Sequence, residues 1–253
     1  MGWGDCACRG RPGKASSPAM TLRLWHPDLD EVRGRAGVPR CWPWLAQCLP
    51  LRGLFAWAAR CAFGLRVRGF EHVPRDRACV FVANHGSHYD GFFLFAAISH
   101  EDPRGLVPVA WDGLLDYPIL GGLLRSVQAV PVAYQNAAGM GRMDNIRAMI
   151  GHLQAGRHVV VQPEGRRDDR LGPFHPGAAA AALGAGAPLV PVTLRGVQPL
   201  FKELGHMPRL HGRVELVFHP PLFPAGEAAE APVWMRRARE RVASALDYPD
   251  ALA

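Results

Sequence analysis

Short runs of apolar, mostly β-branched residues alternate along the chain with longer segments in which apolar residues recur every three or four positions. The short runs predict buried strands, and the periodic segments predict helices with one apolar face. The predicted strands are residues 65–70, 78–83, 106–111, 129–132, 159–162, 189–194 and 213–218. A helix is predicted to start near residue 89, and others lie within residues 114–127, 140–153, 176–183 and 234–246. This alternation indicates an α/β fold with a central, mostly parallel or mixed sheet flanked by helices.

Two of these elements carry more specific expectations. The helix within residues 140–153 has four apolar residues at helical spacing, which predicts a stripe packed against the core. That stripe consists of Met143, Ile146, Ile150 and Leu153. Residues 213–218 alternate between apolar and polar side chains, which predicts a late strand at an edge of the sheet.

The segment before the first strand divides into two parts. Residues 1–40 are expected to be disordered or irregular, because their first half is rich in Gly, Pro and Ser and lacks periodicity. Residues 41–64 form the most apolar long stretch, but prolines and arginines interrupt it too often for a membrane span. It fits two short amphipathic helices that lie in the headgroup region of a membrane, with Trp at the interface. The alternative is a helix packed on the protein's own core.

Composition limits the possible partners. The chain has 253 residues, 49% of them hydrophobic, and a mean hydropathy of −0.02, which fits one globular domain over residues 65–253. A net charge of +7, carried almost wholly by Arg, favours anionic partners such as lipid headgroups or phosphates. Zinc-like Cys/His spacing and an aromatic-basic RNA signature are absent, so nucleic acid is not an expected partner. The six cysteines all lie in the first third and are interpreted as reduced thiols.

The first stretch with chemical content follows the strand at residues 78–83. The strand ends in a turn, and Asp90 lies in the first turn of the next helix. On one continuous helix His85 and Asp90 would lie about 140° apart, but across a turn they can meet. Asp90 would then accept one imidazole N–H of His85 and leave the other nitrogen as a base. Ser87 is predicted to cap the helix.

The second stretch follows the strand at residues 159–162 and carries a carboxylate, a glycine and two arginines. These are Glu164, Gly165, Arg166 and Arg167, directly after Pro163. Because ligands in open α/β folds bind at the carboxyl ends of the strands, both stretches are expected to form one site.

These residues resemble a known family. Residues 84–90 match the Asn-His-x-Ser-x-x-Asp signature of glycerolipid acyltransferases, and residues 163–167 resemble their Pro-Glu-Gly-Thr-Arg block. The likeness, to the bacterial 1-acylglycerol-3-phosphate acyltransferases, extends over about residues 65–220. It implies direct transfer of a fatty acyl group from acyl-CoA or acyl-carrier protein to the hydroxyl of a lyso-glycerophospholipid, in phospholipid biosynthesis. It implies no metal and no cofactor beyond that acyl co-substrate.

The resemblance also implies roles for single residues. His85 would be the general base and Asp90 its partner, with no acyl-enzyme intermediate. Substrate binding would fall to Asn84, Ser87, Arg125, Glu164, Gly165 and Arg167, with Arg167 a candidate for the phosphate. The residue-level alternatives are a satisfied histidine at a strand end, a helix-dipole role for Asp90, and an ordinary turn with solvated charges at residues 164–170.

One departure from the family pattern concerns the acceptor. After the strand at residues 129–132 relatives present an Arg for the acceptor phosphate, whereas this chain has Ala133 and Tyr134. Arg125 or Arg142 would have to substitute. The open alternatives are therefore an acyltransferase acting on an aminolipid or glycolipid, and a catalytically silent lipid-binding relative. The expected location is the cytoplasmic face of the cell membrane, as a peripheral protein that meets its lipid acceptor and its thioester donor there.

Overall fold

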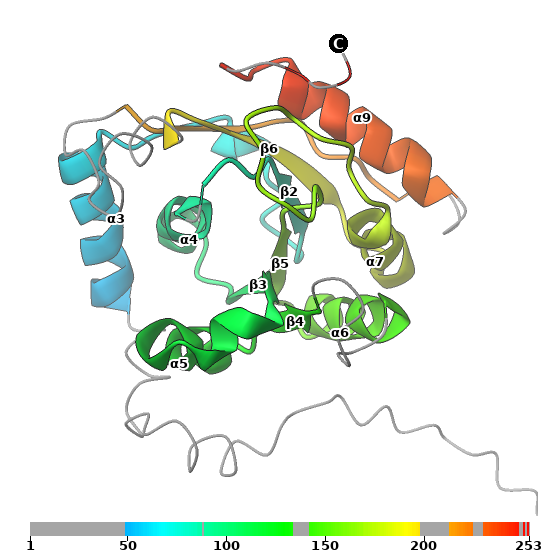
Figure 1. Ribbon diagram of the computed structural model, residues 1–253, viewed down its shortest axis with the longest axis horizontal. Helices are drawn as coiled ribbons and strands as arrows, with labels where there is room; N and C mark the ends of the chain where they lie inside the picture. Colours follow the sequence, from blue (N-terminus) through cyan, green and yellow to red (C-terminus); the bar gives the residue numbers. More distant parts are fainter. Residues whose placement is uncertain are drawn as a thin grey trace, which may run out of the picture.

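A single twisted sheet organises the part of the chain that the computed structural model describes, namely residues 49–87, 89–133, 142–197, 213–224, 230–247, 250 and 252. Its strand order is β1-β7-β6-β2-β5-β3-β4 (Figure 1). The strands are β1 (Arg66–Arg68), β2 (Val80–Ala83), β3 (Leu106–Trp111), β4 (Val130–Val132), β5 (His158–Val161), β6 (Leu189–Arg195) and β7 (Glu215–Phe218).

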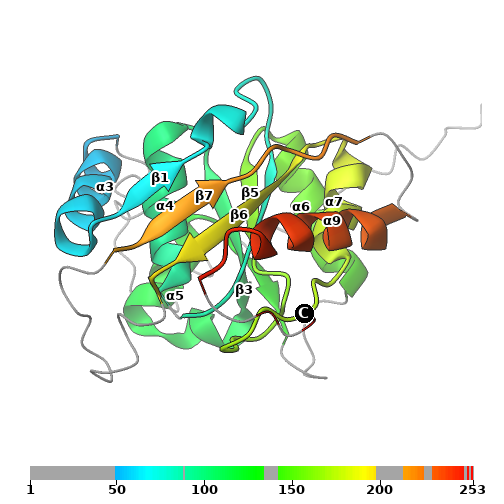
Figure 2. The same ribbon diagram turned by 90° about the horizontal axis from the view of Figure 1, so that it is seen from above.

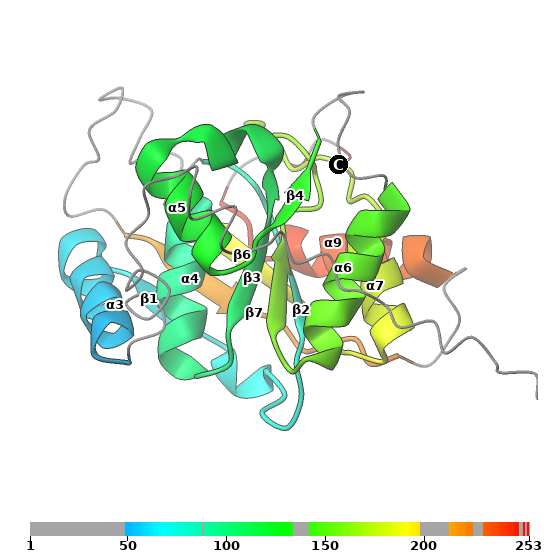
Figure 3. The same ribbon diagram turned by 90° about the horizontal axis from the view of Figure 1, so that it is seen from below.

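Helices cover both faces of this sheet. One face carries α3 (Leu49–Phe63), α4 (Asp90–Glu101) and α5 (Pro118–Ser126), and the other carries α6 (Arg142–Gln154), α7 (Gly177–Ala185) and α9 (Ala231–Ala243) (Figure 1). Two 3₁₀ turns, η1 (Phe70–His72) and η2 (Asp112–Asp116), join strands to the next elements. Figure 3 shows α4 and α6 on opposite sides of the central strands. The predicted α/β class with helices on both faces is therefore confirmed.

The sheet is mixed, with one antiparallel pairing among the described strands. β2 runs parallel to both β5 and β6, and β3 runs parallel to β5 and β4. β6 and β7 are antiparallel, and β1 then pairs with β7 in parallel (Figure 2). The prediction of an edge strand at residues 213–218 is wrong, because the short β1 covers the outer side of β7. The carboxyl ends of β2, β5 and β6 share one edge of the sheet.

Alternation along β2 divides the core into two clusters. Phe81 faces the α3–α4 side and packs with Phe93 and Phe218, while Val80 and Val82 face the α6–α7–α9 side. This follows from the two-residue period of side chains in a strand. The second cluster is filled by alanines of α7 and by residues of α9, which are Ala178, Ala179, Ala181, Ala182, Trp234, Met235 and Ala238.

The buried stripe of α6 differs from the prediction at its first position. Met143 is 59% exposed, so its assignment to the core is wrong. Asn145, Met149 and Leu153 are the buried residues spaced four apart, and Ile146 and Ile150 pack against the cluster at its margin. The helix is therefore rotated so that Met143 faces outward, and the stripe begins two residues later than the pattern indicated.

The apolar segment before β1 contains one described helix, α3. Pro50 lies in its first turn, where a missing backbone N–H breaks no hydrogen bond, so this proline does not interrupt the helix. Ala56 and Ala59 are buried against α4, whereas Leu54 and Trp57 are 56% and 62% exposed. Residues 1–48, with the expected irregular segment and the first of the two expected helices, lie outside the described residues. Among the helices described, none combines the length and the apolar character that crossing a membrane requires.

Candidate active site

His85 and Asp90 meet across the turn that joins β2 to α4. His85 Nδ1 lies 3.0 Å from Asp90 Oδ2, and the backbone N–H groups of Gly86 and Ser87 donate to the same oxygen, each at 2.9 Å. The Asp90 side chain is 1% exposed and the His85 side chain 21%. The contact between His85 and Asp90 is the one that the spacing predicted. The backbone N–H groups of the turn also bind the carboxylate and fix its direction.

This geometry sets the tautomer of the His85 ring. A carboxylate only accepts hydrogen bonds, so the ring proton lies on Nδ1, which donates to Asp90, and the lone pair of the neutral ring lies on Nε2. His85 Nε2 makes no hydrogen bond with any residue of the described ranges. Within the part of the chain that the structure describes, the partly exposed ring thus presents an unbonded basic nitrogen, and a buried carboxylate holds its other nitrogen.

Ser87 does not cap α4, which corrects the expectation from the sequence. The residue before the helix is Tyr89, and no side chain caps the first turn. Ser87 Oγ accepts a hydrogen bond from the Tyr89 N–H at 3.3 Å instead, and the Ser87 side chain is buried. Its hydroxyl therefore stabilises the turn. A role for Ser87 in substrate binding stays a prediction.

Glu164 joins the second predicted stretch to the first. Its Oε1 accepts a hydrogen bond from the His85 N–H, and its Oε2 accepts one from the Gly172 N–H, both at 2.7 Å. Burial raises the pKa of Glu164 above its ordinary value, and the two backbone N–H donors partly offset that effect. Both carboxylate oxygens hold loops together, so Glu164 positions the His85 turn. The two stretches lie side by side, as expected from their place at one edge of the sheet.

The residues after Glu164 divide into a constrained glycine and an exposed basic loop. Gly165 has φ +68°, a left-handed conformation in which a side chain is strained, so glycine is required here. Arg166 lies 3.7 Å from Asp168 at the surface, which fits a solvated charge. The Arg167 side chain is also exposed and makes no hydrogen bond or ion pair with the described residues. Its role in phosphate binding stays a prediction.

Asn84 is committed to the neighbouring strand. Its Nδ2 donates to the Leu194 carbonyl at 2.9 Å, and its Oδ1 accepts from the Leu194 N–H at 2.7 Å. The side chain is 2% exposed and continues the β2–β6 pairing by one step beyond the end of β2. This gives Asn84 a structural role, and its contribution to substrate binding stays a prediction.

Sequence reasoning missed Gln162. Its Nε2 lies 3.2 Å from Asp90 Oδ2, so it contacts the carboxylate that supports His85. The available signal was its position as the last polar residue of a predicted strand at the edge that carries the site.

Among the described residues, the arginines considered for the acceptor phosphate make no hydrogen bond or ion pair with His85. Arg125 lies half-buried in the last turn of α5, and Arg142 is exposed at the first residue of α6, on the opposite face of the sheet. Ala133 follows the end of β4, whereas Tyr134 lies outside the described residues. Within the described ranges no group of three or more His, Cys, Asp or Glu side chains is arranged to hold a metal ion.

Comparison with known proteins identifies the family. The model of the family described as Acyltransferase matches residues 64–195, just over half of the chain. A chloroplastic 1-acyl-sn-glycerol-3-phosphate acyltransferase of Brassica napus is 27% identical over 184 residues, covering 72% of this chain and 50% of that protein. The 1-acyl-sn-glycerol-3-phosphate acyltransferase of Pseudomonas aeruginosa is 27% identical over 183 residues, covering 69% of this chain and 66% of that protein. This chain belongs to the acyltransferase family.

A solved structure supports the fold. The crystal structure of the 1-acyl-sn-glycerophosphate acyltransferase PlsC from Thermotoga maritima superimposes with a TM-score of 0.62 at 24% identity, covering 84% of each chain. This likeness confirms the architecture of a central mixed sheet flanked by helices. The chain spans about half the length of the plant relatives it matches.

Proposed function

We propose that this protein transfers a fatty acyl group from an acyl thioester to the hydroxyl of a lyso-glycerophospholipid of the 1-acylglycerol-3-phosphate type. The observation that carries the proposal is the His85 ring, whose Nδ1 is held by buried Asp90 and whose Nε2 has no hydrogen-bond partner among the described residues. Membership of the acyltransferase family and its likeness to 1-acyl-sn-glycerol-3-phosphate acyltransferases support it. Residues 65–253 would form the catalytic unit, with acyl-CoA or acyl-carrier protein as donor.

The proposed reaction needs one base and no covalent enzyme intermediate. His85 Nε2 accepts the proton of the acceptor hydroxyl while that oxygen attacks the thioester carbonyl. The tetrahedral intermediate then collapses with cleavage of the carbon–sulfur bond, and the thiolate takes the proton back from the imidazolium. Asp90 holds the ring and stabilises its transient positive charge.

The experiment is a comparison of His85→Ala with a matched control. His100 is an exposed histidine at the far end of α4, so His100→Ala makes the same change on an adjoining element away from the site. Turnover of a thioester with 1-acylglycerol-3-phosphate should fall by about 10²–10⁴-fold in His85→Ala and stay constant in His100→Ala. Equal turnover in His85→Ala and the parent protein would overturn the proposal.

A second candidate acceptor follows from one observation. Ala133 follows β4 at the position where the family resemblance implies an arginine for the acceptor phosphate. This favours a lyso-lipid with another headgroup, an aminolipid or a glycolipid, with the same chemistry at His85. An acceptor panel decides between the two, since a clear preference for 1-acylglycerol-3-phosphate contradicts the second candidate. A catalytically silent lipid-binding protein is the outcome if no acceptor supports thioester consumption.

Peripheral attachment to the cytoplasmic face of the cell membrane is part of the proposal. Leu54 and Trp57 on the outer side of α3 provide an exposed apolar surface of the kind that enters a headgroup region.

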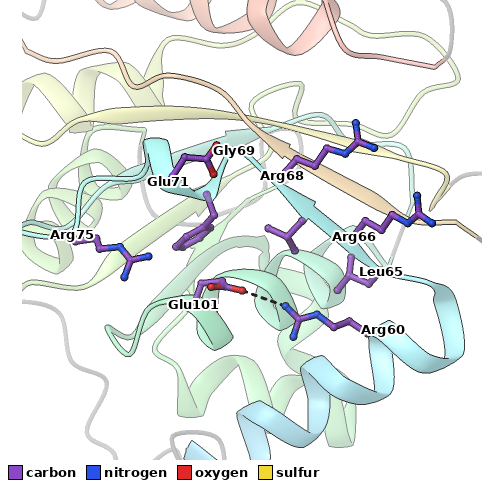
Figure 4. Close-up of a pocket in the computed structure, with 10 residues that line it drawn as sticks. Arg60, Leu65, Arg66, Arg68, Gly69, Glu71, Arg75 and Glu101 are labelled. Carbon is purple, nitrogen blue, oxygen red and sulfur yellow. Dashed lines mark hydrogen bonds and ion pairs between the residues drawn. The ribbon is translucent and has the colours of Figure 1, made fainter.

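Beside the end of α3 and β1 lies a pocket of ≈ 610 Å³ to which four arginines contribute (Figure 4). Arg60 is paired with Glu101 at 3.2 Å, whereas Arg66 and Arg75 make no ion pair with the described residues. Arg60 lies on the same helix as exposed Trp57, and cationic side chains near an exposed indole suit an anionic lipid surface.

A further inference from the structure

Among the described residues, one hydrogen bond to the Asp90 carboxylate comes from outside its own turn. Oδ2 accepts from the His85 ring and from the backbone N–H groups of Gly86 and Ser87, all within the β2–α4 turn. The fourth donor is the side-chain amide of Gln162, at 3.2 Å. Since a carboxylate only accepts, the amide nitrogen of Gln162 must be the group that faces it.

Gln162 reaches Asp90 because of the sheet register. Val82 of β2 pairs with Val161 of β5, so the residues that follow these strands lie next to each other at the same edge. Gln162 is the residue directly after β5 and is half-buried. Asp90 is fully buried, so a donor aimed at its carboxylate acts in a medium that screens charge weakly.

We propose that Gln162 is a positioning residue that tunes His85 through Asp90, an inference that rests on the proposed role of His85 as the base. The amide N–H fixes the rotation of the carboxylate, and it withdraws part of the negative charge that the His85 ring would otherwise meet. A less negative Asp90 favours the neutral ring, which is the form that accepts a proton. Gln162 therefore extends the pH range over which the base is competent toward lower pH.

The surrounding charges do not supply this effect by themselves. Among the described residues, the titratable groups that interact with Asp90 are His85, from the turn after β2, and Glu164, from the loop after β5. Glu164 directs both oxygens at backbone N–H groups, so it gives Asp90 no hydrogen bond. On the β6 side Asn84 is bonded to the Leu194 backbone. Gln162 is thus the side-chain amide, among the described residues, that adjusts the charge of this carboxylate.

The test uses two substitutions of similar shape. Gln162→Met removes the donor, and Gln162→Glu replaces the donor with a carboxylate. The pH profile of kcat/KM for acyl transfer should show its acidic limb at higher pH in Gln162→Met, and at still higher pH in Gln162→Glu. The expected displacement is about half a pH unit or more, equivalent to a threefold or larger loss of activity on that limb. Gln154→Leu, at an exposed position near the end of α6, is the matched control and should leave the profile unmoved.

A second measurement separates this inference from the proposed function. Nitrogen NMR of the His85 ring follows its titration without any substrate, and the midpoint should move upward in the same order. If the parent protein transfers no acyl group but the midpoint still moves, the proposed function fails and the tuning by Gln162 stands. An unmoved midpoint and limb in both folded variants would overturn the inference. Loss of folding in both variants would also overturn the inference, because a role in packing alone would then explain why Gln162 is present.

Discussion

The Glu164 carboxylate accepts a hydrogen bond from the backbone of His85 and not from its ring. Its Oε1 accepts the His85 N–H at 2.7 Å, and its Oε2 accepts the N–H of Gly172 from a loop eight residues further along the chain. A carboxylate placed this way determines where the histidine stands without contacting its reactive nitrogen. The position of His85 therefore depends on a residue 79 positions away in the sequence.

Glu164→Gln should weaken both the fold and the reaction. An amide has one accepting oxygen and one donating nitrogen, so one of the two backbone N–H groups would face another donor. The free energy of unfolding should fall by about 1–3 kcal/mol, and turnover should fall with it. Urea unfolding and a turnover assay measure the two effects. Glu240→Gln, at an exposed site on α9, is the control, and equal losses in the two variants would contradict the role of Glu164.

Asp90→Asn should reduce catalysis far more than stability. The amide oxygen still accepts the N–H groups of Gly86 and Ser87, but an amide does not hold the His85 ring in the required tautomer. Turnover should drop by about 10²–10⁴-fold. Combining Asp90→Asn with His85→Ala should cost hardly more than His85→Ala alone, because the pair acts as a unit. Multiplicative losses in the double variant would show that the two residues act separately.

Asn84→Ala should lower the free energy of unfolding more than it affects catalysis. The substitution leaves the buried N–H and carbonyl of Leu194 without their partners, and each costs on the order of 1–3 kcal/mol. The midpoint of urea unfolding should fall, while the KM for the lyso-lipid measured on the remaining folded protein should stay within twofold. A large rise in KM with unchanged stability would instead favour the substrate-binding role predicted from the sequence.

Acid should destabilise the fold partly through His219. Burial lowers the pKa of His219 to about 4, and its Nε2–H donates to Thr193 Oγ1, which itself donates to the Val242 carbonyl. Between pH 6.5 and 4 the unfolded chain binds a proton at this histidine while the folded protein does not, so stability falls as pH falls. Urea unfolding at pH 7, 6 and 5 should show a smaller acid loss in His219→Gln. Parallel pH dependence in the two proteins would contradict this.

Trp57→Ala should weaken binding to lipid vesicles. Trp57 is 62% exposed on the outer side of α3, where an indole would enter the headgroup region. Cosedimentation with vesicles that contain anionic phospholipid measures the effect, and severalfold weaker binding is expected. Met143→Ala removes a similarly exposed apolar side chain from α6, on the opposite face of the sheet, and should leave binding unchanged. Equal loss in both variants would argue against α3 as the contact.

Local sequence patterns predict the part of the site whose residues lie close together in the sequence. The strand, turn and helix around His85 and Asp90 are adjacent, so spacing and residue type sufficed to predict the contact. The hydrogen bonds from Asn84 to Leu194 and from Glu164 to Gly172 depend on which strands and loops lie side by side, and no local signal reports that.

The fold shows the same division. The strands and helices were predicted because burial produces regular periods, but the neighbours of a strand leave little trace in its own pattern. In β7 the alternation of Leu216 and Phe218 with partly exposed residues reports one buried face, and it does not reveal that β1 covers the outer side. Met143 of α6 was misplaced because several apolar stripes fit one helix, and packing selects among them.

The packing of α3 bears on how the protein is produced in the laboratory. Ala59 is fully buried, and Phe63 meets the ring of Phe93 edge to face, with centroids 5.4 Å apart. Deleting this helix to improve solubility would expose the aromatic cluster to solvent and promote aggregation. Truncated proteins intended for crystallisation should therefore begin no later than Leu49. The exposed indole of Trp57 should be covered by detergent and not removed by deletion.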